Sequence, residues 1–484
     1  MASFAASATT SRDASDKIVP LHFFDDGPLW RAFILYSMFV FDCTLDVEKL
    51  HTSLERLVHK DGWWKLGARL KKNAQKNGNL EYHIPGEFTA DRPAITYSHV
   101  HYDMSSTSHP LASRLPKASS HPSVVGDPDD FHDLMLPTGA PKKLNDYISS
   151  DRPQLGLHIV TCKDMTLVTL YWPHTLMDAM GKKALLDAWC QMLNGKDDEV
   201  KTPHGTDTDP LTALGTAPTE PHGLATQQMG IFGLVGYGLG SAMEFFRKQE
   251  NRIVCVPRSF VDQLHRDAIA ELTSAQSEST APQPFLTEGD VLCAWWTRIA
   301  VLHLPPTSAR TVVLNNAYDV RKPLQRDLIP EGAAYVSNAI GFINVLLSVK
   351  DIMEKPLSYV AQSIRSAITQ LGTRDQIESF FALIRQSSGK LPPFFGDKNM
   401  HMITFSNWTK ANLFHLDFSS ALVDGSTSKI AKPRYIQNNQ FGLILPNGFP
   451  IIGKDIQGNF WLSGYMNKSH WADIESMLAK EGRS

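Results

Sequence analysis

The sequence predicts an α/β (α+β) protein built from two mixed-sheet domains. Segments with strand and helix patterns alternate along both halves of the chain. At 484 residues the chain is longer than a single hydrophobic core usually supports. Residues 196–222 are polar and rich in Asp, Thr and Pro, as linkers often are. We therefore expect one domain at 1–195, a crossover linker at 196–222 and a second domain at 223–484.

The first half begins with a strand and a helix. Residues 29–42 are dense in aromatic and branched side chains, a composition that favours a β-strand. Residues 46–58 carry apolar side chains every three or four positions, which predicts a helix. Residues 67–102 resemble short strands and turns. Residues 103–142, full of Ser, Pro, Asp and His, predict an irregular surface stretch.

The first half ends with two expected strands and a helix. Residues 155–162 and 166–172 are both apolar and β-branched, with a turn between them. Pro173 lacks an amide hydrogen and is suited to the exit of a strand. A helix is expected over 180–193, ending at Asn194-Gly195.

Expected helices and strands alternate in the second half of the chain as well. The helices expected are 259–271, 287–302, 357–371 and 470–480, and the strands expected are 310–318, 338–349, 441–446, 451–456 and 459–465. Thr287 and Asp290 have the spacing of a capping box. Residues 229–246 hold many glycines but match neither GxGxxG nor a P-loop, so we expect a flexible glycine-rich segment there.

Composition excludes several classes of protein. A net charge of -3 gives no reason to expect nucleic acid as a partner, and Lys182-Lys183 is interpreted as a solvated helix face. The five cysteines are scattered without zinc or redox spacing, which indicates reduced core residues and no metal site. No secretory signal or run long enough to span a bilayer is recognised. We expect a cytoplasmic monomer.

The strongest chemical signal is the segment Tyr171 to Gly181, where a strand is followed by Pro173, His174 and, four residues on, Asp178. A neutral histidine suits general-base catalysis at cellular pH. An Asp at this distance can orient the ring or clamp the loop. With 18 histidines in the chain, such a spacing also arises by chance.

The segment resembles the H-x-x-x-D-G motif of the CoA-dependent acyltransferase superfamily, and specifically of the BAHD acyltransferases of plant and fungal secondary metabolism. Three further patches agree in the family's order. They are Leu286–Asp290 followed by Ala294-Trp295-Trp296, Asn315–Arg321 followed by Tyr335–Asn338, and Ser406-Asn407-Trp408 followed by Leu416–Ala421.

Two departures from the family pattern stand out. Ala179 replaces the glycine that follows the Asp, and Gly181 comes two residues later, so the loop exit should differ. The D-F-G-W-G motif has become D-F-S-S-A, which keeps only Asp417 and Phe418. That motif is structural in the family and lies far from the base.

The resemblance implies a chloramphenicol-acetyltransferase-like fold of two similar domains with a substrate tunnel between them. A segment near 400–418 would cross to the first domain. His174 would be the general base, and Asp178 would hold the loop through an ion pair with Arg321. The other roles implied are Ser406 and Trp408 near the oxyanion and the acceptor, Asp417 in a structural salt bridge, and Thr287 and Asn338 as cofactor-binding residues.

The resulting expectation is transfer of an acyl group, acetyl in the first instance, from acyl-CoA to a hydroxyl of a hydrophobic secondary metabolite such as a terpenoid, alkaloid or polyketide. No cofactor would be bound permanently. Two alternatives stay open. One is an N-acyltransferase or a condensation-type amide or ester former, although Pro173 occupies the place of the second His that condensation domains carry. The other is an inactive, acyltransferase-shaped binding protein.

Overall fold

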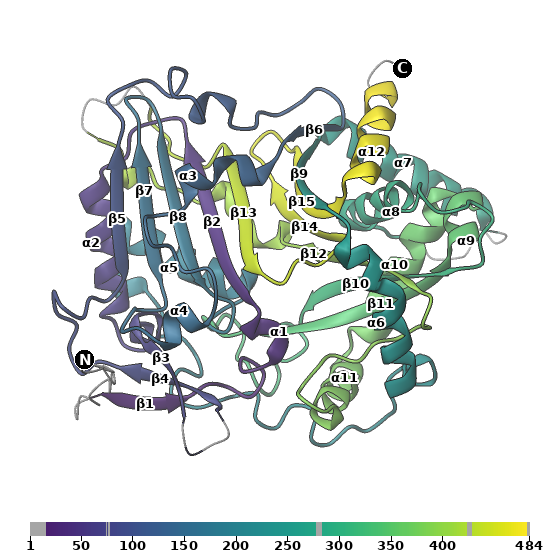
Figure 1. The fold of residues 1–484 in the computed structure, drawn as a ribbon, viewed down its shortest axis with the longest axis horizontal. Coiled ribbons are helices and arrows are strands. Elements are labelled where there is room, and N and C mark those ends of the chain that lie inside the picture. The colour runs from purple at the N-terminus through teal and green to yellow at the C-terminus, as the bar shows by residue number, and fades with distance from the viewer. Residues whose placement is uncertain (1–15, 74, 76–77, 277–282, 424–427, 482–484) are drawn as a thin grey trace, which may run out of the picture.

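The computed structural model describes residues 16–73, 75, 78–276, 283–423 and 428–481, which form two sheet-centred halves side by side (Figure 1). The first half holds a five-stranded sheet in the order β13 (Tyr435–Gly442), β2 (Phe33–Phe41), β8 (Thr166–Pro173), β7 (Gly156–Thr161) and β5 (Thr96–His101). A three-stranded sheet of β1 (Lys17–Pro20), β4 (Leu80–Ile84) and β3 (Arg69–Lys72) lies at its end.

The second half holds a seven-stranded sheet. Its order is β11 (Ile340–Ser348), β10 (Thr311–Asp319), β12 (His401–Asn407), β14 (Gly448–Lys454), β15 (Phe460–Asn467), β9 (Gln249–Val256) and β6 (Ser123–Gly126). Most neighbouring strands are antiparallel, but β12 runs parallel to both β10 and β14. The sheets are therefore mixed, as expected.

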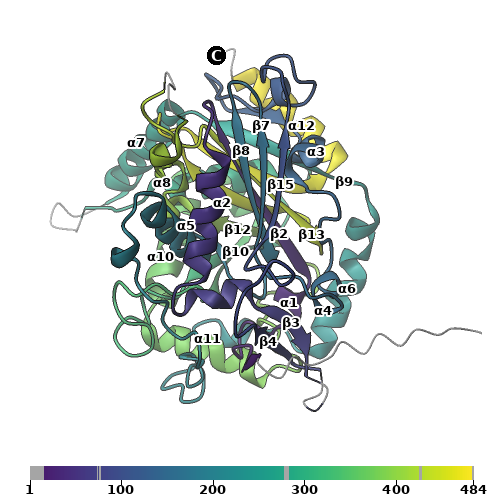
Figure 2. The same ribbon diagram turned by 90° about the vertical axis from the view of Figure 1, so that its left-hand side faces the viewer.

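Helices cover the sheets and complete two main cores. In the first half they are α1 (Pro28–Arg31), α2 (Val47–Val58), α3 (His132–Met135), α4 (Asn145–Ile148) and α5 (Ala179–Leu193). In the second half they are α6 (Ile231–Phe246), α7 (Arg258–Ala275), α8 (Glu288–Ala300), α9 (Val349–Glu354), α10 (Leu357–Leu371), α11 (Arg374–Gln386) and α12 (Lys468–Glu481). Helices α2 and α5 pack together against the five-stranded sheet (Figure 2).

The halves exchange strands, so they are not cleanly sequential. Strand β13 comes from the second half of the chain and pairs with β2, with Asn438 opposite Ser37. Strand β6 comes from the first half and pairs with β9. Strand β13 is thus a strand that crosses, whereas β12, at the start of the segment 400–418, stays between β10 and β14. Only the turns after β12, around Leu413 and Phe418, pack into the first core.

Three local expectations need correction. The strand expected from residue 29 starts at Phe33, because Pro28 occupies the first turn of α1. The strand expected at 441–446 lies earlier in the chain, at Tyr435–Gly442 (β13). Its polar residues Gln437–Gln440 do not show the apolar pattern by which a strand is recognised. Helix α11 and strand β12 were not anticipated from the sequence.

The glycine-rich segment is a helix, not a flexible stretch. Helix α6 spans Ile231–Phe246 and packs Leu234 and Tyr237 beside Met400 and Val313. A Cβ at Gly236 would lie 3.2 Å from the Cβ of Lys398, so a small residue permits this close approach. No helix in the described part of the chain is long and apolar enough to cross a membrane.

Candidate active site

His174 lies where β8 ends, between the two sheets. Its backbone N–H donates to the carbonyl of Phe33, 3.0 Å away, which continues the pairing of β8 with β2 by one residue. The imidazole packs on the indole of Trp30, with ring centroids 4.5 Å apart. Nδ1 is buried. The edge of the ring that carries Nε2 is therefore the one that can meet a substrate.

Hydrogen bonds to the backbone hold the His174 loop in place. Asn338 Nδ2 donates to the carbonyl of His174 over 3.0 Å, and the Tyr82 hydroxyl donates to the carbonyl of Thr175 over 3.2 Å. Trp172 Nε1 donates to the carbonyl of Met177 over 3.0 Å. Burial lowers the pKa of His174, against the opposing effects of its own backbone carbonyl, the charge of Asp178 and Asn338. The ring is therefore neutral and able to accept a proton near pH 7.

Asp178 faces away from the imidazole and caps α5. Its carboxylate is 1% exposed and accepts the backbone N–H of Gly181 over 2.7 Å and that of Ala339 over 2.8 Å. Arg321 makes a bidentate ion pair with it, at 2.8 and 3.0 Å. Arg321 also donates to the carbonyl of Ser337 over 2.7 Å. The expected Asp178–Arg321 pair is thus present, and it joins β10 and the loop before β11 to the start of α5.

The chain enters α5 directly after Asp178. Ala179 is simply the first residue of α5. The close approach falls at Gly181, where an added Cβ would lie 2.0 Å from the carbonyl oxygen of Val336. A glycine is therefore needed two residues after Ala179, because the helix touches the backbone of the second half there.

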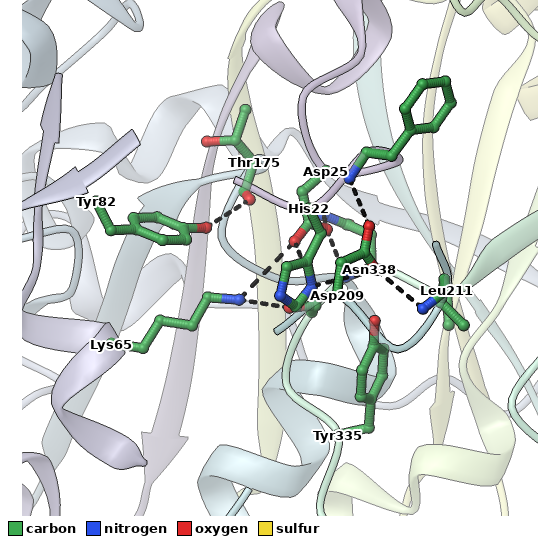
Figure 3. A network of polar contacts seen from close by, with 12 residues as sticks. His22, Asp25, Lys65, Tyr82, Thr175, Asp209, Leu211, Tyr335 and Asn338 are labelled. Carbon is green, nitrogen blue, oxygen red and sulfur yellow. Dashed lines mark hydrogen bonds and ion pairs between the residues drawn. The ribbon is translucent and has the colours of Figure 1, made fainter. Parts of the chain in front are cut away.

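A buried network of charged groups supports this loop from behind (Figure 3). Asp25 accepts from both the backbone and the side-chain amide of Asn338, at 2.9 and 2.8 Å. Lys65 Nζ lies 3.8 Å from Asp25 and donates to Ser337 Oγ. His22 lies between Asp25 and Asp209. Burial raises the pKa of Asp25 to about 6, although Lys65 and Asn338 oppose the rise.

In front of His174 lies a cavity of about 200 Å³ with walls from both sheets. Ser406 and Trp408, expected on the oxyanion and acceptor side, both line it. Trp408 Nε1 donates to Ser406 Oγ over 2.7 Å, which leaves the hydroxyl hydrogen of Ser406 free to donate elsewhere. The cavity wall is mostly apolar, as in pockets for hydrophobic small molecules.

Three residues have other partners than those expected. Asn338, expected to bind cofactor, is buried and donates to Asp25 and to the carbonyl of His174. Thr287 caps α8 through Asp290 and receives a bond from Arg365. Asp417 is exposed and accepts from Ser419. Among the described residues it forms no salt bridge.

Among the cavity residues that the sequence analysis missed, Lys182 is the one with an ionisable amine. Lys182 was expected on a solvated helix face together with Lys183, but it is 1% exposed and lines the cavity. Its position four residues after Asp178 places it on the same inward face of α5, and that spacing was the available signal. Lys183 does face outward, paired with Asp187.

The comparisons with known proteins agree with this geometry. A model of the Transferase family matches residues 127–422. The chain is 40% identical over 479 residues to a Penicillium decumbens protein named transcriptional regulator calD, covering 96% of both chains. It is 36% identical over 485 residues to the acetyltransferase adrJ of Penicillium roqueforti, covering 97% of both chains.

A solved structure shares the fold. The F. sporotrichioides protein TRI101, crystallised with coenzyme A and T-2, superposes with a TM-score of 0.69 at 15% identity, covering 95% of this chain and 97% of that one. The fold is that of the chloramphenicol-acetyltransferase-like enzymes, as the sequence predicted. The chain therefore belongs to the Transferase family, the BAHD-type acyltransferases, and is an acyltransferase.

Proposed function

We propose that the protein transfers an acyl group, acetyl in the first instance, from a CoA thioester to a hydroxyl of a hydrophobic small molecule, with His174 as the general base. The observation that carries the proposal is His174 itself, a neutral imidazole held by its backbone at the wall of a largely apolar cavity. Relatives named acetyltransferase adrJ and O-acyltransferase pboC support acyl transfer.

The reaction needs no covalent enzyme intermediate. The acceptor hydroxyl gives its proton to Nε2 of His174 while its oxygen attacks the thioester carbonyl carbon. Ser406, whose hydroxyl hydrogen is free, is placed to donate to the oxyanion that forms. When the C–S bond breaks, the CoA thiolate takes the proton from His174, leaving the ester and free CoA. In this scheme Asp178 and Arg321 maintain the loop and touch no reacting atom.

A CoA thioester as donor is supported by the fold shared with TRI101, which was crystallised with coenzyme A. Nucleic-acid binding, which the name of calD raises, finds no support in a net charge of -3. A cytoplasmic location and a monomeric state remain part of the proposal.

The test is thiol release by the purified protein. Acetyl-CoA is offered with a panel of terpenoid, alkaloid and polyketide alcohols, together with amines of similar size. Free CoA is measured colorimetrically, and the acylated product is identified by mass spectrometry. Release of CoA with at least one alcohol, together with its acetyl ester, is expected. Release no faster than background hydrolysis with every acceptor would contradict the proposal.

A further inference from the structure

Lys182 is a buried cation-forming group in the cavity that the proposed reaction does not use. Its Nζ donates to Ser37 Oγ over 3.0 Å and to Asn438 Oδ1 over 3.1 Å. It also lies 4.6 Å from the ring centre of Trp408 and 5.8 Å from that of Trp172. Both hydrogen-bond acceptors are neutral, so the position carries no fixed negative charge.

The absence of a counter-charge sets Lys182 apart. Among the described residues, no Asp or Glu forms an ion pair with Lys182, and the residues that line the cavity include neither Asp nor Glu. A charged ammonium buried without a partner is costly, and burial accordingly lowers the pKa of Lys182 to about 7. Groups perturbed in this way collect at sites that bind ligands.

A second donor belongs to Asn438, the residue whose Oδ1 accepts from Nζ. Lys182 and Ser37 both direct their hydrogens at Oδ1 of Asn438, so the Nδ2 group of this amide is turned the other way. That Nδ2 is buried and has no hydrogen-bond partner among the described residues, although Asn438 lines the cavity. An unpaired buried N–H is unfavourable until a ligand oxygen meets it.

We propose that Lys182 binds an anionic oxygen of a substrate, a carboxylate or an enolate, inside the reaction cavity, and that the unpaired amide of Asn438 supplies a second donor to the same substrate. The proposal rests on the proposed function and names the chemistry of one of its substrates. The anion can be carried by the acceptor molecule or by the acyl group of the thioester. In either case the substrate supplies the negative charge that pairs with the ammonium group of Lys182.

Proton uptake should accompany binding. The other titratable groups of the cavity are His174, Tyr36 and Tyr465. Burial raises the pKa of both tyrosines, which stay uncharged, and lowers that of His174. The lowered pKa of Lys182 favours the neutral amine as the pH rises above 7, and an anion beside it favours the ammonium form. An anionic ligand should bind with uptake of up to one proton, and less tightly as the pH rises above 7.

The test uses octanoate and octan-1-ol as a matched acid and neutral probe. Binding is measured by titration calorimetry at pH 8 in two buffers of different ionisation enthalpy, which reports proton uptake. Wild-type protein should bind octanoate more tightly than the alcohol, with proton uptake. Lys182→Met should weaken octanoate binding about 10- to 100-fold, as expected for a lost charged hydrogen bond, and leave octan-1-ol unchanged. Lys183→Met, on the exposed face of the same helix, should change neither.

A second arm identifies the source of the anion. Binding of malonyl-CoA is compared with that of acetyl-CoA. If Lys182→Met removes a preference for malonyl-CoA, the anion is on the donor; if it removes only octanoate binding, the anion is on the acceptor. Octanoate binding no tighter than octan-1-ol and no preference for malonyl-CoA, or preferences kept in Lys182→Met, would overturn the proposal. Because these are binding measurements, they stay informative if thiol release fails.

Discussion

Two buried lysines near the His174 loop, Lys65 and Lys182, have different kinds of partner. Lys65 belongs to the network behind His174, where Asp25 lies 3.8 Å from its ammonium. Lys182 belongs to the cavity in front, where only neutral oxygens accept from it. Burial lowers the pKa of both amines, but the charge of Asp25 opposes the shift only for Lys65. Lys65 therefore has a counter-charge within the fold, whereas Lys182 has only neutral hydrogen-bond partners.

Behind the loop, the largest loss of stability should follow from removing Asp178. Asp178→Ala leaves largely buried Arg321 with only Asp319 as an ion-pair partner, and breaking a buried pair of this kind typically costs about 3–5 kcal/mol. The free energy of unfolding, measured by denaturant titration, should fall by about that amount. The control is Asp417→Ala, at an exposed residue without an ion pair among the described residues, which should change stability by about 0.5 kcal/mol or less. Equal losses of unfolding free energy in the two variants would contradict a stabilising role for the Asp178–Arg321 ion pair.

The two lysines can be compared directly by the same substitution. Lys65→Met leaves the carboxylate of Asp25 buried without its cation and should cost about 3 kcal/mol of unfolding free energy. Lys182→Met removes an unpaired buried amine of similar volume and should be neutral or stabilising. Denaturant titrations of the two variants side by side check this contrast. A loss of stability in Lys182→Met as large as that in Lys65→Met would show that Lys182 serves the fold.

A smaller effect is expected where α5 touches the second half. Gly181→Ala would place a methyl group 2.0 Å from the carbonyl oxygen of Val336, so the helix must shift. Overpacking of this kind costs about 1–3 kcal/mol. Ala179→Gly restores the family glycine at the first position of α5 and should cost roughly 0.5 kcal/mol. Thermal unfolding of both variants tests whether the glycine requirement has moved to position 181.

The smallest expected effect is a displacement of the pH profile. Burial lowers the pKa of His174, so the imidazole stays neutral at a lower pH than a free histidine. The acid limb of kcat/KM should therefore have its midpoint below pH 6.5, the ordinary value for histidine. A midpoint above 6.5 would mean that the charge of Asp178 outweighs burial at the ring.

Features of the site that depend on neighbouring residues were predicted better than contacts between residues far apart in the sequence. The strand that ends at Pro173 and the helix after Asp178 follow from neighbouring residues, and the family resemblance supplied Arg321. The spacing from Asp178 could have indicated that Lys182 faces inward, but its partners could not be foreseen, because Ser37 and Asn438 meet only when β13 crosses between the halves. The contact between Asn338 and Asp25 could not be read from the sequence either, since the two residues lie 313 positions apart.

The central claim is that His174 is the base that enables acyl transfer. The most direct measurement compares CoA release by wild-type protein and His174→Ala, with an acceptor that the wild type acetylates. We expect the rate to fall about 10²- to 10⁴-fold, the usual contribution of a general base, while the Kd for CoA stays unchanged. CoA release by His174→Ala as fast as by the wild type would contradict the assignment.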